Sequence, residues 1–261
     1  MALEHPGSSS EALSDSKIDD FKFTSARSAS NSFLASGGSS TQSIDGEYIE
    51  ASLNGEWVIG STFNTTLTFG TQTLQPTSPY TFGEFFIASV DSSGTWTSLF
   101  GADHSFGGGG LSSLSDISVD VTGEIVVTGF FYGDISFSNS GGGPGFIISN
   151  TNSGFHQEGF IAKADQMGNW LWATSFSTIV NGSGEFSTTK NVEVSASGDV
   201  YVSGSFQGET DFGGIALNVS NTQIFVSQFD GRSGLLNWVI SGGGIGTNQV
   251  LDTAVTTSGG V

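Results

Sequence analysis

Three aspartates occur at matching places along the chain and are the residues best suited to metal chemistry. Asp91, Asp165 and Asp230 each end an apolar run and precede a glycine by three or four residues. Carboxylate oxygens bind Ca²⁺ when loop carbonyls complete the coordination shell. These aspartates lack the alternating acidic pattern of a dedicated calcium loop, and an aspartate before such a turn commonly accepts backbone N–H groups. We therefore predict that they cap turns, with calcium binding as the alternative and no other cofactor.

The remaining reactive side chains are few and scattered. His5, His104 and His156 show no metal-ligand spacing, and the chain has no cysteine to serve as a nucleophile or a thiolate ligand. The glycine run 107–110 is not followed by the lysine and helix of a phosphate-binding loop. We identify no catalytic residues and predict that the chain is not an enzyme.

The run 89–96, with Asp91, Gly94 and a terminal tryptophan, resembles the Asp-box of sialidases. Its aspartate-to-glycine gap is one residue longer than that motif prefers. Arg27 and Arg232 are the only arginines, and two cannot form the cluster that holds a substrate carboxylate. Because an Asp-box is a structural turn in any case, this resemblance implies no active site.

Composition excludes several kinds of partner. With 25 acidic and six basic residues, the net charge is −19, so the chain cannot present a basic stripe to nucleic acid or to an anionic membrane surface. No apolar run reaches the roughly 18 residues of a membrane-spanning helix, so we predict no membrane insertion. The 22 phenylalanines and five tryptophans are sufficient to build a packed core.

The chain contains an internal repeat. The turn glycines Gly55, Gly123 and Gly198 lie 68 and 75 residues apart, and Gly259 follows after a further 61. Around each glycine, apolar and polar residues alternate with the period of a half-buried strand. The second half of each unit carries another strand pair, so each unit holds four short strands, which is the content of a propeller blade.

Two aromatic positions recur in the second halves of the units. The phenylalanines are Phe86, Phe160 and Phe225, and the tryptophans are Trp96, Trp170 and Trp238. Recurrence at one point of each unit predicts packing in the core. The alternative is that these tryptophans, together with Trp57 and Trp172, form stacking platforms for sugars.

A glycine and a phenylalanine mark the middle of each unit. The spacing is eight residues from Gly129 to Phe137 and from Gly204 to Phe212, but nine from Gly60 to Phe69.

We therefore expect an all-β fold of tandem four-stranded antiparallel blades of a β-propeller, forming an incomplete ring that is a fragment of a longer protein. The rival architecture, an open β-solenoid, usually has shorter repeats. The expected segments are a disordered N-terminus at 1–20, a remnant of a preceding blade at 21–44, three repeats at 45–106, 107–182 and 183–245, and a truncated fourth at 246–261.

The repeats are similar to a known family. The run 197–206, followed by Phe225, Val226 and Asp230, resembles the SBBP-type β-propeller repeats of large secreted or surface proteins in bacteria and archaea. Residues 160–165 followed by 168–173 show the same pattern. The resemblance implies a four-stranded blade and an extracellular location, and it implies no reaction. The chain departs from the pattern at Gln223, where an acidic residue is usual.

These observations favour a non-catalytic extracellular segment that acts as a structural, adhesion or protein-binding scaffold. The expected partner is a protein or glycan at the cell surface. Two alternatives stay open: a carbohydrate-binding propeller, and an accessory part of a larger secreted hydrolase whose active site lies elsewhere.

Overall fold

The computed structural model describes residues 47–77, 83–104, 111–139, 145–150, 156–179, 184–246 and 248–256, together with the backbone of three short strands nearer the N-terminus. Within these ranges the chain forms strands, turns and connecting segments, and every pairing of two named strands is antiparallel. No helix able to span a bilayer occurs among them. The predicted all-β class is therefore confirmed.

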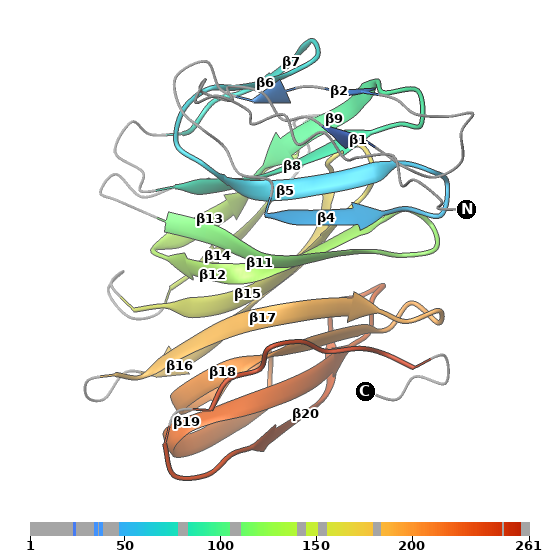
Figure 1. Ribbon diagram of the computed structural model, residues 1–261. Coiled ribbons are helices and arrows are strands. Elements are labelled where there is room, and N and C mark those ends of the chain that lie inside the picture. The colour runs from blue at the N-terminus through green and yellow to red at the C-terminus, as the bar shows by residue number, and fades with distance from the viewer. Residues whose placement is uncertain are drawn as a thin grey trace, which may run out of the picture.

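The strands form three four-stranded meanders that follow one another along the chain and stack face to face in Figure 1. The first blade contains β4 (Tyr48–Ala51), β5 (Trp57–Phe63), β8 (Glu84–Val90) and β9 (Trp96–Gly101). The second contains β11 (Leu111–Val119), β12 (Ile125–Tyr132), β15 (Glu158–Ala164) and β16 (Trp170–Ile179). The third contains β17 (Phe186–Val194), β18 (Val200–Asp211), β19 (Ala216–Phe229) and β20 (Leu236–Gly242). The first strands of the blades, β4, β11 and β17, lie side by side, and we call this region the hub.

Side chains before the turn glycines close the first hairpin of the second and third blades. Asp120 Oδ1 accepts the N–H groups of Thr122 and Glu124, and Ser195 Oγ accepts that of Asp199. The glycine of each turn, Gly123 or Gly198, has φ near +85° or +88°, which residues with a Cβ adopt only with strain. These turns set the register of the strands that follow.

A second, smaller sheet joins each blade to its neighbour. It is formed by the hairpins β6 (Leu67–Phe69) with β7 (Gln72–Leu74) and β13 (Asp134–Phe137) with β14 (Phe146–Ser149), and by the far halves of β18 and β19. The strand that arrives from the preceding unit pairs with each hairpin. Thus β10 (Asp103–His104) pairs with β13, and the end of β16 pairs with the end of β18.

Near the N-terminus, β1 (Phe23–Thr24) pairs with β2 (Leu34–Ala35), and β3 (Gly37–Gly38) pairs with β6. The pairing of Gly38 with Thr68 corresponds to that of Asp103 with Ser136. The interpretation of 21–44 as the remnant of a blade stays a prediction. The segment 1–20, His5, the glycine run 107–110 and Gly259 lie outside the described residues.

The register corrects the sequence-based alignment of the first unit. Gly129 pairs with Phe160 and Gly204 pairs with Phe225, but the residue that pairs with Phe86 is Ser61 and not Gly60. Measured from Ser61, the distance to Phe69 is eight residues, as in the other two units. The spacing of nine arose because the sequence comparison matched glycine with glycine, whereas the equivalent backbone position in the first blade is occupied by a serine.

The register also corrects the alignment of one tryptophan. Trp96 pairs with Val90 and Trp170 with Ala164, but the corresponding partner in the third blade is Leu236. Trp238 lies two residues further on, opposite Gln228, which is the place of Trp172 in the second blade. The turn after Asp230 is one residue longer than the other two. The sequence comparison matched Trp238 by residue type, two residues beyond the backbone position that Leu236 occupies.

The core is built from phenylalanines that recur in all three blades. Phe69, Phe137 and Phe212 occupy one repeated position and are completely buried, as are Phe86, Phe160 and Phe225 at a second. Between blades, Phe85 of the first stacks on Phe160 of the second with ring centroids 5.5 Å apart. Each blade therefore buries the aromatic face of the next, which an isolated four-stranded sheet could not do.

Candidate functional site

The three predicted turn aspartates cap turns. Asp91 Oδ1 accepts the N–H groups of Ser93 and Thr95 at 2.8 and 2.9 Å, and Asp165 and Asp230 accept two backbone N–H groups each. Hydrogen bonds from the Ser93 hydroxyl and then from backbone N–H groups hold the pKa of Asp91 below its ordinary value. Among the described residues, no group of three or more His, Asp or Glu side chains is arranged to hold a metal ion.

The two histidines in the described part of the chain lie in different segments. His104 is buried, with Nδ1 3.1 Å from the Asp134 carbonyl oxygen and Nε2 3.2 Å from Ser112 Oγ. Burial lowers its pKa, so the imidazole is neutral at pH 7 and connects β10 to β11 and β13. His156 is partly buried in a different loop, and its carbonyl oxygen accepts a hydrogen bond from Asn150.

The tryptophans are either buried or only partly buried. Trp170 and Trp172 are buried, and their indole N–H groups donate to the carbonyl oxygens of Gly101 and Gly231 in the neighbouring blades. Trp96 is partly buried and packs edge-on against Phe69, with centroids 4.6 Å apart. Trp170 and Trp172 therefore contribute to packing between blades rather than to an open platform.

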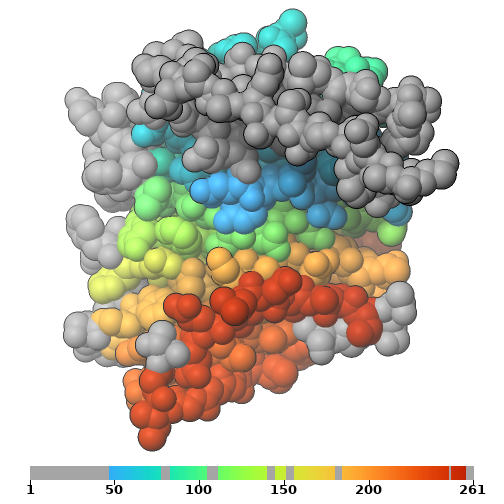
Figure 2. Space-filling model, in the orientation of Figure 1, coloured from blue at the N-terminus to red at the C-terminus, as the bar shows by residue number. Residues whose placement is uncertain are grey.

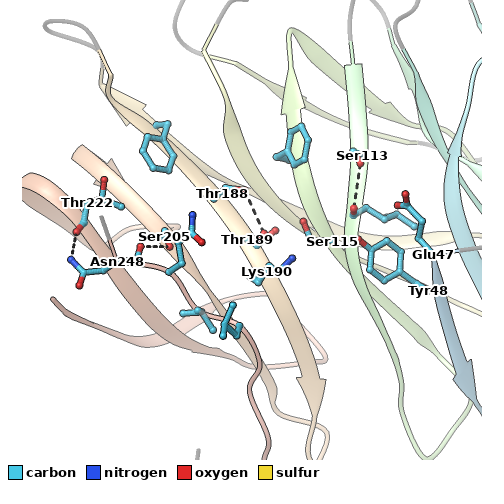
Figure 3. A pocket seen from close by; sticks show the side chains of 16 residues that line it. Glu47, Tyr48, Ser113, Ser115, Thr188, Thr189, Lys190, Ser205, Thr222 and Asn248 are labelled. Atoms are coloured by element: carbon cyan, nitrogen blue, oxygen red, sulfur yellow. Dashed lines mark hydrogen bonds between the residues drawn. The ribbon is translucent and has the colours of Figure 1, made fainter. Parts of the chain in front are cut away.

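Sequence reasoning missed a pocket at the hub, which we call the hub pocket. It has a volume of about 420 Å³. Residues 113–115 of β11 and 188–190 of β17 line it, together with Glu47 and Tyr48 just before and in β4 and the segment 248–251. Figure 3 shows Lys190 and Ser115 on facing strands, with Tyr48 and Glu47 on the far side. No local motif marks these residues, because they meet only when the first strands of successive blades are brought together.

Two β-bulges help to form the hub pocket. The ladder between β11 and β12 skips Ser115, and the ladder between β17 and β18 skips Lys190. A bulge leaves one residue outside the ladder and redirects its side chain. Ser115 and Lys190 thus hold the same position in successive blades, and both line the pocket.

Hydrogen bonds between the second and third blades hold the strands of the hub together. Asp116 Oδ2 accepts the Val192 N–H at 2.9 Å, and Ser118 Oγ accepts the Val194 N–H at 3.2 Å. The segment 248–256, red in Figures 1 and 2, runs beside the third blade. It is attached there by Ser205 Oγ, which donates to the Asn248 carbonyl oxygen at 3.2 Å, and by contact between the Ser203 and Thr253 hydroxyls.

Carboxyl groups lie along the hub next to the pocket. Burial, followed by the charge of Asp116, raises the pKa of Glu50 and of Glu193, and Glu50 and Asp252 add to the effect on Glu193. Burial also raises the pKa of Asp116 itself, despite hydrogen bonds from the Val192 and Ile117 N–H groups. The hub therefore carries a negative potential at neutral pH.

A buried lysine connects the second and third blades at their turns. Lys163 Nζ lies 2.9 Å from Asp120 Oδ2 and 2.7 Å from Glu124 Oε2, and it donates to the Gly231 carbonyl oxygen at 3.1 Å. Burial alone would raise the pKa of Asp120, but hydrogen bonds from Thr122 and Lys163 bring it below its ordinary value. Lys163 thus serves the packing of blades and is not available to a ligand.

Comparison with models of known protein families gives no match for this chain, and comparison with curated proteins gives no significant match.

Proposed function

We propose that this chain is a non-catalytic β-propeller segment that serves as a binding scaffold, with the hub pocket as its binding site. One contrast supports the proposal. Several positions that build the blades keep their residue type from the second blade to the third, as Ser112 and Ser187 or Phe131 and Phe206 show. Two positions that line the pocket change in character between the same blades, from Ser115 to Lys190 and from Phe130 to Ser205. Stacked repeats form extended surfaces that repeat proteins use for binding, and we take the varied lining as the specific part of such a surface.

The partner class follows from charge and from the resemblance to SBBP-type repeats. A net charge of −19 and the carboxyl groups of the hub disfavour nucleic acid and anionic lipid. The resemblance supports a location outside the cell or on its surface. We therefore propose a protein or glycan of the cell surface as the partner of the pocket.

The test exchanges residues between equivalent positions, because each replacement already occurs at the matching place in another blade. The double variant Phe130→Ser with Lys190→Ser introduces the residues of the third and second blade, respectively. The matched control is Ile147→Ser with Arg232→Ser, which removes one exposed apolar and one basic side chain outside the pocket. Both variants are expected to keep the unfolding free energy within about 1 kcal/mol of the native chain.

The intact chain is immobilised, and fractions of surface protein and surface polysaccharide are passed over it. We expect the native chain and the control to retain a component that the pocket variant loses by at least about tenfold. Equal retention by the pocket variant would show that binding occurs elsewhere. Turnover of glycoside or ester substrates by the purified chain would contradict the non-catalytic assignment.

A further inference from the structure

Three aromatic rings of the hub pocket keep part of their surface exposed, although the Tyr48 ring also packs against the core of the first and second blades. Tyr48, Phe130 and Phe186 line the pocket, and each is only partly buried. The residue next to Phe130 is Phe131, which is completely buried and belongs to the core. The three lining rings come from different blades and leave apolar surface open within the pocket. Such rings offer flat apolar faces together with a weakly negative π-surface.

Polar groups that both donate and accept hydrogen bonds surround these rings. Hydroxyls come from Ser115, Thr188 and Thr222, and amides come from Asn248 and Gln249. The Asn248 amide N–H donates to the Thr222 carbonyl oxygen at 2.8 Å, while no described residue forms a hydrogen bond with the side chains of Ser115 or Gln249. Hydroxyls and amides are suited to a ligand whose own groups are hydroxyls.

The charged residues that line the pocket indicate the net charge of the ligand. Glu47 is the only acidic and Lys190 the only basic residue among the described residues that line the pocket. An anionic ligand at Lys190 would also meet the field of Asp116, Glu193 and Asp252 along the hub. A ligand without net charge avoids this repulsion, and the Lys190 ammonium can still donate hydrogen bonds to neutral oxygen atoms.

Resting on the proposed function, we propose that the hub pocket binds a neutral saccharide. The rings of Tyr48, Phe130 and Phe186 pack against the C–H faces of the sugar, and the hydroxyl, amide and ammonium groups bind its hydroxyls. A volume of about 420 Å³ lies within the range of small-molecule sites. None of the five tryptophans lines the hub pocket, so the sugar site is separate from the tryptophans that the sequence suggested.

The experiment measures binding of neutral oligosaccharides to the intact chain by isothermal titration and saturation-transfer NMR. The probes are gluco-, manno-, xylo- and galacto-oligosaccharides, and an oligogalacturonate serves as the anionic comparison. We expect at least one neutral probe to bind, and Phe130→Ser to weaken that binding at least about tenfold through the loss of ring contact. Lys190→Ser weakens it by a smaller factor, and the controls Ile147→Ser and Arg232→Ser leave it unchanged.

The outcomes separate this inference from the proposed function. If no neutral probe binds, or if oligogalacturonate binds as tightly as the best neutral probe, the saccharide proposal is overturned. That result leaves the scaffold function supported if the native chain still retains a surface component and the Phe130→Ser, Lys190→Ser double variant does not. If probes bind but neither substitution changes the affinity, both the site and the ligand assignment fail. Matching melting temperatures of the variants confirm that lost binding is not lost folding.

Discussion

The carbonyl oxygen of Ser113 lies so close to Gly129 that a side chain at residue 129 would overlap it. The carbonyl oxygen of Thr188 meets Gly204 in the same way. Both contacts lie beside the bulges that direct Ser115 and Lys190 into the hub pocket. The glycine therefore permits the bulge, and the bulge places the pocket residue.

Substitution of these glycines should destabilise the fold. We expect Gly129→Ala and Gly204→Ala each to lower the free energy of unfolding by about 2 kcal/mol, because backbone must move to admit the methyl group. Ser61 is the matched control, because it holds the equivalent position in the first blade. The described ladder between β4 and β5 ends at Tyr48, before it reaches Ser61. Ser61→Ala should cost less than about 1 kcal/mol. Denaturant titration measures all three, and equal costs at the three sites would contradict this account of the bulges.

Removal of the buried lysine should be costly. Lys163→Met leaves Asp120 buried without its counter-charge, and we expect a loss of about 3 kcal/mol in unfolding free energy. Combining it with Asp120→Asn should recover part of that loss, because the unpaired charge is then removed. Denaturant titration of the single and double variants measures the recovery. A double variant that loses the sum of the two single effects would show that Lys163 and Asp120 are not coupled.

The hub carboxyls should respond to pH in the direction set by their raised pKa values. A folded-state pKa above the unfolded value means that protonation favours folding, so the charge on Glu193 destabilises the fold at neutral pH. Glu193→Gln should therefore stabilise the chain at pH 7, by no more than about 1 kcal/mol. The gain should disappear as pH falls through the folded-state pKa of Glu193.

Thermal melts of Glu193→Gln and the native chain at several pH values measure this effect. The control is Glu56→Gln, which lies in the first hairpin turn of the first blade and away from the hub. A gain at pH 7 that persists unchanged at acid pH would exclude charge repulsion as its cause.

The turn aspartates should contribute through hydrogen bonds and not through calcium. Asp165→Ala removes acceptors for Met167, Asn169 N–H and the Asn169 amide, and we expect a loss of about 1 kcal/mol. The melting temperature of the native chain should be the same in chelator and in millimolar Ca²⁺. A rise with Ca²⁺ that Asp165→Ala abolishes would assign a calcium site to this turn.

The sequence was informative wherever one unit resembled the next. Positions such as Phe160 and Phe225 repeat because each blade packs the same face, so local comparison predicted the four-stranded units. It failed by one residue at Ser61 and by two at Trp238, where residue type and backbone position diverge. The hub pocket could not be predicted in this way. Its residues vary between blades, and they come together through contacts between segments as distant as Tyr48, Lys190 and Gln249.

The central claim is that this chain binds its ligand at the hub, and amide hydrogen exchange of the intact chain tests it most directly. Exchange is compared with and without the neutral oligosaccharide mixture, or with the retained surface component. The account predicts added protection at 113–115, 188–190 and 248–251, which line the hub pocket. Protection confined to the hairpin turns 120–124 and 195–199, at the other end of the first strands, would contradict it.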